Sequence, residues 1–236
     1  MYRSGTPKFY KQALAEETDN GFAVLLDGRP LKSPAGSPLC VSSAGLAQKI
    51  AKEWSAQEDT INPSIMPMTS MCCTMLDRIV PRKLEITKQL LRYVETDLLC
   101  YRAQEPADLT RRQHEEWQPL IDWVAESYGA RLVVTEGILP VRQPQAALES
   151  LSTVIDELND SELTALSCVA PIAGSTVVGL ALVSGRIKAT EAISIVQLDE
   201  EYQNEMWGTV EEAQLQQKGI QKEIESAATF VQLANS

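Results

Sequence analysis

The spacing of the large apolar residues changes near residue 43, and this change limits the folds that the chain can adopt. Every second residue from Phe22 to Leu26 is large and apolar, as in a β-strand with one buried face. Asp27 and Gly28 follow, a pair preferred in two-residue hairpin turns because both positions need a positive φ. From residue 44 to 58 the spacing becomes four, which places Trp54 on the apolar side of a helix. We therefore expect structural roles for Gly28, in a sheet, and for Trp54, in a helix.

Helical patterns continue to the end of the chain. Two short helices are expected first, at residues 68–79, stopped before Pro81, and at residues 84–95. After Pro106 the chain is mostly helical. The expected helices there include residues 144–159, 161–170, 173–184, 189–206 and 210–234. We expect an α+β protein, with a small N-terminal α/β domain containing a short antiparallel sheet and a helical-bundle C-terminal domain. The domains are predicted at residues 1–82 and 83–236, with a junction anywhere between 80 and 105.

One uncharged stretch, residues 163–183, is long enough to span a bilayer. Pro171, Gly174 and Gly179 interrupt it, and an ordinary amphipathic pattern follows. These features favour two buried helices that meet near Pro171 and Gly174, walled by other helices. We expect no stable membrane insertion.

The composition disfavours two classes of partner and indicates a compartment. The net charge is −11, with 32 acidic and 21 basic residues among 236, which disfavours binding to nucleic acid or to anionic lipid. The five cysteines are odd in number, and no pair has the two-residue gap of a zinc knuckle or a redox dithiol. This pattern indicates buried free thiols in a reducing compartment.

The sequence offers little for catalysis. It contains neither a phosphate-binding loop nor a dinucleotide fingerprint, and its single histidine, His114, cannot form the histidine pair of a zinc protease. We predict no cofactor and no metal. Glu201 and Glu205, four residues apart on one helix, are the one candidate acid–base pair, although such pairs usually form a solvated acidic face.

A second feature of the acidic stretch 197–214 points to binding. Trp207 is followed by Gly208, a helix-ending residue, and then by Thr209, a candidate N-cap for the next helix. Trp207 and Glu211 are therefore expected near each other at a corner between two helices, where Gly208 has a structural role. An exposed tryptophan with carboxylates around it is typical of a protein-binding surface.

Five blocks of the sequence resemble the family of ATP synthase assembly chaperones that binds the alpha subunit of the catalytic head, found in mitochondria and alphaproteobacteria. The blocks are FAVLLDGRPLKSP (22–34), EWSAQEDTINPSIMPMT (53–69), TDLLCYRA (96–103), RQHEEWQPLIDW (112–123) and LDEEYQNEMWGTVE (198–211). One departure falls at Cys72, Cys73 and Met75, where the family more often has an Asn and aliphatic residues. The resemblance implies two domains and binding rather than chemistry.

The resemblance and the acidic corner together give the candidate partner-binding residues, which are Glu211, Trp207, Gln203, Glu201 and Asp97. The expected function is that of a non-catalytic chaperone that keeps the unassembled alpha subunit from aggregating. A hydrolytic enzyme with paired carboxylates and an acidic scaffold for another partner stay open as alternatives. We expect a monomer in the bacterial cytoplasm, or in the mitochondrial matrix if the sequence is a mature form.

Overall fold

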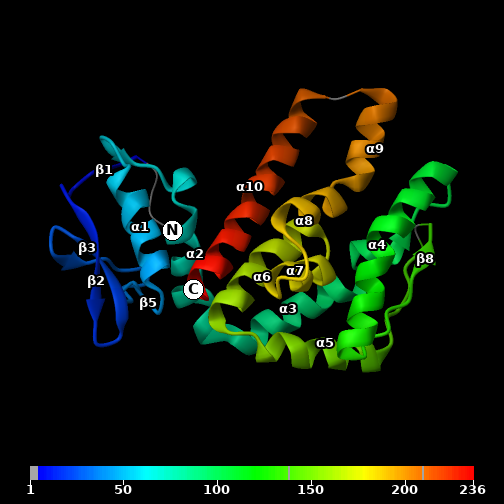
Figure 1. Ribbon diagram of the computed structural model, residues 1–236, viewed down its shortest axis with the longest axis horizontal. Coiled ribbons are helices and arrows are strands. Elements are labelled where there is room, and N and C mark those ends of the chain that lie inside the picture. Colours follow the sequence, from blue (N-terminus) through cyan, green and yellow to red (C-terminus); the bar gives the residue numbers. More distant parts are fainter. Residues whose placement is uncertain (1–4, 138, 209) are drawn as a thin grey trace. The chain divides into compact units, whose positions relative to one another are not determined.

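The computed structural model describes residues 5–137, 139–208 and 210–236, and the chain divides into two compact units (Figure 1). The first contains the residues up to Arg82 together with Thr229–Ser236, and the second contains Lys83–Ala228. The four-stranded antiparallel sheet lies in the first unit, and the second is mainly helical. The predicted α+β class, with a short antiparallel sheet and a helical C-terminal region, is confirmed.

The sheet of the first unit is organised around one central strand. Its strands are β2 (Ala13–Thr18), β3 (Gly21–Leu26), β4 (Arg29–Pro30) and β5 (Cys40–Val41), and a separate pair is formed by β1 (Thr6–Pro7) and β6 (Thr60–Ile61). The strand β3 pairs with each of the other three strands of its sheet. Between β3 and β4, Asp27 and Gly28 have φ angles of 48° and 77°. The predicted two-residue turn is confirmed, and Gly28 has the positive φ that the turn requires.

Helix α1 (Ala44–Ser55) packs on β2 and β3 and brings Trp54 into the core. Ser43 begins the helix, since its side chain accepts a hydrogen bond from the Leu46 backbone N–H at 3.3 Å. Trp54 has no exposed surface, and the Tyr10 hydroxyl donates to its carbonyl oxygen at 2.7 Å. The tryptophan therefore lies in the core of the first unit, as its position on the apolar stripe predicts.

Glu53 is also buried, although it carries a carboxylate. Its two oxygens accept hydrogen bonds from the backbone N–H groups of Met68 and Thr69, both at 2.8 Å, and from the Thr69 hydroxyl. These residues begin helix α2 (Pro67–Thr74), whose first N–H groups have no partner within the helix. Glu53 thus caps a helix that lies 14 residues or more further along the chain.

The prediction that a helix stops before Pro81 is wrong. After α2 the backbone continues as a wider π turn, Met75–Ile79, and then as a 3-10 turn, Val80–Arg82, that contains Pro81. A proline is tolerated in the first turn of a helical segment because its missing N–H would have no partner there. Helix α3 begins at the next residue, Lys83.

The second unit consists mainly of helices. These are α3 (Lys83–Glu95), α4 (Ala107–Tyr128), α5 (Gln145–Glu157), α6 (Asp160–Ala173), α7 (Thr176–Val183), α8 (Ala189–Val196), α9 (Leu198–Trp207) and α10 (Glu211–Ala234), the last of which contributes to both units. A 3-10 turn, Leu98–Cys100, and two short parallel strands, β7 (Tyr101–Arg102) and β8 (Thr135–Glu136), complete it.

The uncharged stretch 163–183 forms α6 and α7, which meet at Gly174. Every residue of α7 is buried, as are the apolar residues Leu163, Leu166 and Val169 of α6. Gly174 ends α6 with a φ of 60°, and α6 includes Pro171 instead of stopping before it. Within the residues that the structure describes, no helix is long and apolar enough to cross a membrane.

The single helix predicted for residues 189–206 is wrong, since it is divided at Gln197 into α8 and α9. The Gln197 side chain is buried and lies against α10. Its Nε2 donates to the Gln217 carbonyl at 2.9 Å, and its Oε1 accepts from Gln221 Nε2 at 3.0 Å. The break therefore accompanies contacts with residues about twenty positions further along the chain, which no local pattern could reveal.

Candidate partner-binding surface

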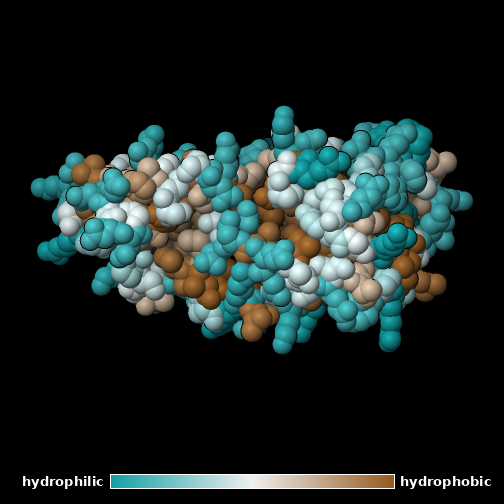
Figure 2. Space-filling view, turned by 60° about the horizontal axis from the view of Figure 1, so that its bottom comes forward, coloured by the Kyte–Doolittle hydropathy of each residue, from teal (hydrophilic) through white to brown (hydrophobic). Residues whose placement is uncertain are grey.

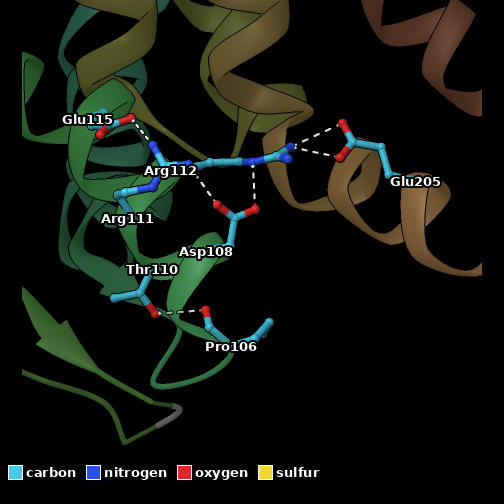
Figure 3. A network of polar contacts seen from close by, with 7 residues as sticks. All are labelled: Pro106, Asp108, Thr110, Arg111, Arg112, Glu115 and Glu205. Carbon is cyan, nitrogen blue, oxygen red and sulfur yellow. Dashed lines mark hydrogen bonds and ion pairs between the residues drawn. The ribbon is translucent and has the colours of Figure 1, made fainter.

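Helix α9 is held against α4 by the charged contacts in Figure 3. Arg112 of α4 donates to both carboxylate oxygens of Glu205, at 3.0 and 2.9 Å. The same guanidinium lies 5.3 Å from the centre of the Tyr202 ring, and Tyr202 is buried. Asp108, one turn before Arg112, pairs with both Arg111 and Arg112. These contacts fix the side of α9 that faces α4.

The start of α9 is fixed as well. Gln113 of α4 donates through Nε2 to the Asp199 carboxylate at 2.7 Å. At the junction with α8, Gln197 links the base of α9 to Gln217 and Gln221 of α10. Figure 1 shows α9 and α10 extending in the same direction from this base, which leaves their far ends as a helical hairpin.

Gly208 ends α9 at the tip of this hairpin. Its backbone N–H donates to the Asn204 carbonyl at 2.9 Å, and its φ and ψ angles are 83° and 168°. This region of backbone space is essentially restricted to glycine. A Cβ atom at Gly208 would meet nothing within 4 Å, so glycine is required for its conformation and not for space. The expected N-cap, Thr209, lies outside the described residues.

Four large apolar side chains are exposed where α9 ends and α10 begins. These are Met206, Trp207, Val210 and Leu215, with exposed fractions of 59%, 78%, 67% and 65%, and we call them the α9–α10 corner. On the face in Figure 2, hydrophobic side chains reach the surface in patches separated by hydrophilic ones. Exposed apolar side chains concentrated in one short segment commonly mark an interaction site, and tryptophan is enriched among residues that dominate binding energy.

The predicted polar residues divide into two groups around this corner. Glu211 is exposed in the first turn of α10, beside the apolar residues, where the helix dipole also favours an acid. Gln203 is exposed one turn before Trp207 and shares its side of α9. Glu201 instead shares a side with Glu205. Burial raises the pKa of Glu201, and the nearby charges of Glu205 and Glu200 raise it further.

Asp97 was predicted to contact a partner, but it has no exposed surface. Its Oδ1 accepts from the Leu99 N–H at 3.1 Å and its Oδ2 accepts from the Val177 N–H at 3.0 Å. It therefore joins the 3-10 turn after α3 to the first turn of α7. Burial raises the pKa of Asp97 to about 6, although hydrogen bonds from Ser175 and from these backbone groups oppose the shift. No atom of Asp97 is available to a partner, so this residue has a structural role and the prediction that it contacts a partner is wrong.

The arrangement of the acids does not resemble a hydrolytic site. Glu205 is paired with Arg112, and Glu201 and Glu205 are both exposed on one helix side, not facing each other across a cleft. His114 is exposed on α4. Among the described residues, no group of three or more His, Cys, Asp or Glu side chains could hold a metal ion.

Met206 and Leu215 were not predicted as companions of Trp207, whereas Val210 lies within the last of the five blocks that carry the family resemblance. A signal was present for Leu215, since it lies off the stripe formed by Ile220 and Ile224 and cannot share their buried side. Arg112 was not predicted either, since its partner Glu205 is 93 residues away in the sequence. A pairing over such a distance leaves no local pattern.

Comparisons with known proteins identify the family to which this chain is related. Residues 7–125 match the family model described as ATP12 chaperone protein. The crystal structure of Atp12 from Paracoccus denitrificans is 37% identical, with a TM-score of 0.91 over 97% of this chain and 98% of that one. A protein from Agrobacterium tumefaciens is 34% identical, with a TM-score of 0.88 over 98% of this chain and 86% of that one.

A curated relative, the mitochondrial protein atp12 of Schizosaccharomyces pombe, is 26% identical over 94% of this chain and 80% of its own length. The family match, the fold and the resemblance of the five sequence blocks therefore agree. The chain belongs to the ATP12 chaperone family, the assembly chaperones of ATP synthase.

Proposed function

We propose that this protein is a non-catalytic assembly chaperone that binds the unassembled alpha subunit of the ATP synthase catalytic head. It holds the alpha subunit through the α9–α10 corner and prevents its aggregation until beta subunits replace it. The observation that carries this proposal is the exposed Trp207, with apolar neighbours and Glu211 beside it, on two helices that the body of the unit holds in place.

The chemistry of the corner suits this task. An unassembled subunit exposes apolar surfaces that beta subunits later cover, and such surfaces aggregate. The apolar corner can cover part of such a surface, with Trp207 as the anchor. The second unit carries 24 acidic and 12 basic residues, and the resulting charge raises the solubility of the pair.

Release requires no chemical step. A beta subunit that competes for the same surface displaces the chaperone, so the cycle needs no ATP. The protein acts as a monomer in the bacterial cytoplasm, or in the mitochondrial matrix if the sequence is a mature form. Its relatives include a mitochondrial fungal protein and one from the bacterium Paracoccus denitrificans.

The test is capture of purified, unassembled alpha subunit by the immobilised protein. Glu211→Lys reverses a charge beside the corner. It is expected to weaken capture about tenfold, because an attraction between Glu211 and the client would become a repulsion between like charges. Glu223→Lys, on an exposed position of the same helix three turns further along, makes the same charge change and should capture like wild type. Equal capture by the Glu211→Lys variant and the Glu223→Lys control contradicts the proposed site.

The wild-type result separates the remaining alternatives. Wild type that fails to retain the alpha subunit, while it retains another protein stoichiometrically, indicates an acidic scaffold with a different client. Capture that beta subunits do not reverse contradicts release by competition.

A further inference from the structure

A groove of about 380 Å³ lies within the second unit, lined by α9, α10 and the end of α6. Its volume falls within the ~300–1,000 Å³ of pockets that bind small ligands, so a few residues of an extended chain fit it but a folded domain does not. Gln203 lines the α9 side, and Trp207 follows one turn later on the same side of that helix. The groove therefore leads toward the α9–α10 corner.

Part of the lining is apolar. Pro171 and Ile172 come from α6, Ala213 and Ile220 from α10, and Leu98 from the 3-10 turn that follows α3. Each of these side chains keeps part of its surface exposed. An apolar side chain that enters the groove removes this surface from water, which favours binding.

Side-chain amides form much of the polar lining. Gln203 and Asn204 of α9 face the groove from one helix, and Gln216 and Gln217 of α10 from the other. A carboxamide carries both a hydrogen-bond donor and an acceptor, which are the two groups that a peptide bond presents. These side chains therefore match the backbone of a polypeptide, whatever its sequence.

One of these amides has a buried donor without an acceptor. Gln217 Nε2 is buried and has no hydrogen-bond partner within the described part of the chain. Buried polar atoms are nearly always paired, because an unpaired one has lost its hydrogen bonds to water without replacement. The Gln217 backbone carbonyl accepts from Gln197, which holds this turn of α10 beside the groove. A carbonyl oxygen of a bound segment would supply the missing acceptor.

The charges of the groove favour a basic ligand. Asp199 and Glu200 line it, and no lysine or arginine is found among the described residues of its lining. Asp199 already accepts a hydrogen bond from Gln113 at 2.7 Å. Glu200 is exposed, so its carboxylate can pair with a cation of the ligand.

We propose that this groove binds an extended segment of the client, in which an apolar side chain packs on Ile172 and Ile220 and a neighbouring basic side chain pairs with Glu200. The backbone of the segment pairs with the carboxamides, including the Gln217 donor. The proposal rests on the function proposed above for the choice of client, and it adds the class of segment that the chaperone recognises.

The first test uses a fluorescein-labelled peptide in which leucine alternates with lysine, measured by fluorescence anisotropy. Wild type is expected to bind it. The same peptide with its backbone N–H groups methylated should bind at least about tenfold more weakly, because backbone hydrogen bonds are lost. Equal binding of the two peptides overturns recognition of the backbone.

Gln217→Met tests the buried donor, since methionine has a similar size and no amide. We expect peptide binding to weaken about fivefold while the melting temperature stays the same or rises, because an unpaired buried donor is removed. Gln48→Met, at an exposed position of α1, is the control and should bind like wild type. A lower melting temperature with unchanged binding would assign Gln217 a structural role and contradict the proposal.

Glu200→Lys tests the charge of the groove. It should weaken binding of the leucine–lysine peptide at least about fivefold, because an attraction becomes a repulsion. Glu223→Lys makes the same change in net charge at an exposed position outside the groove, and should weaken binding less. Equal losses in the two variants would mean that the peptide senses only the net charge, and the assigned site would be wrong.

The same variants in the alpha-subunit assay separate the two proposals. If wild type captures the alpha subunit and Gln217→Met and Glu200→Lys capture it equally well, the groove is not a client site and the proposed function stands. If wild type captures no alpha subunit while the leucine–lysine peptide binds as described, the proposed function fails and the groove binds a segment of another client.

Discussion

Two tryptophans near helix ends have opposite environments, and the difference separates what holds this protein together from the surface that we propose binds a partner. Trp54 lies in the last turn of α1 in the first unit and has no exposed surface, whereas Trp207 ends α9 in the second unit and is 78% exposed. Beside Trp54, the Tyr10 hydroxyl donates to the Trp54 carbonyl oxygen. Around Trp207 the apolar neighbours are exposed too.

The charges of the two units differ in the same way. The residues up to Arg82 carry nine basic and eight acidic side chains, whereas Lys83–Ala228 carries 12 and 24. The net charge of −11 therefore belongs to the second unit. The unit that carries the exposed corner is therefore also the unit that carries the net negative charge.

The largest effect is expected for Trp54→Arg. Truncation of a buried tryptophan costs about 3–5 kcal/mol, and an unpaired buried charge adds to this cost. We expect the free energy of unfolding to fall by about 4 kcal/mol or more, as measured by chemical denaturation. A variant that melts like wild type would mean that Trp54 is exposed, and the contrast with Trp207 would fail.

Asp97 distinguishes a buried acid from the exposed acids of the same unit. Its folded pKa of about 6 exceeds the value of about 3.9 in an unfolded chain, so the folded state binds the proton more tightly. The stability that this group contributes therefore rises as the pH falls from about 7 through 6 toward 4, by up to about 3 kcal/mol.

Asp97→Asn is the variant that isolates this contribution, because it cannot ionise. Its free energy of unfolding should change less between pH 7 and pH 5 than that of wild type. It should also be less stable at pH 5, where the loss of one hydrogen-bond acceptor for the Val177 N–H costs about 1–3 kcal/mol. Parallel pH profiles for the two proteins would show that Asp97 does not titrate in this range.

Trp207→Ser tests the other side of the contrast. We expect binding of the alpha subunit to weaken by about 2 kcal/mol, which is roughly 30-fold, while the free energy of unfolding changes by less than about 0.5 kcal/mol. Leu84→Ser is the control, since Leu84 is 75% exposed in the same unit but lies outside the corner. Titration calorimetry and thermal melting measure the two effects. A loss of stability without a loss of binding would reverse the interpretation.

The smallest effect concerns the contact that holds α9. Arg112 and Glu205 are both partly exposed, so their pairing should contribute about 0.5 kcal/mol and weaken in salt. A double-mutant cycle with Arg112→Gln and Glu205→Gln measures this coupling. A coupling above about 2 kcal/mol would mean that the pair governs the fold of the second unit and not merely the orientation of α9.

The sequence predicts features that depend on neighbours in the chain. Asp27 and Gly28 specify their turn, and the four-residue spacing places Trp54 in the core, because these signals are local. The helix break at Gln197 and the burial of Asp97 could not be predicted from local signals. The break at Gln197 accompanies contacts with α10, and the burial of Asp97 depends on α7, 80 residues later.

The candidate site shows the same division. The helix end at Trp207 and Gly208 could be predicted from the sequence, since a glycine ends a helix through its own backbone conformation. The exposure of Met206 and Val210 depends on what the folded chain leaves uncovered.

Hydrogen exchange of the protein with and without unassembled alpha subunit tests the central claim most directly. The backbone amides of residues 203–215 in the second unit should exchange more slowly in the complex, because a bound partner covers the corner and suppresses fraying of both helix ends. The amides around Trp54 should remain unchanged, since this core is already buried. A complex that forms while exchange at residues 203–215 stays as in the free protein would contradict the proposal that the α9–α10 corner binds the client.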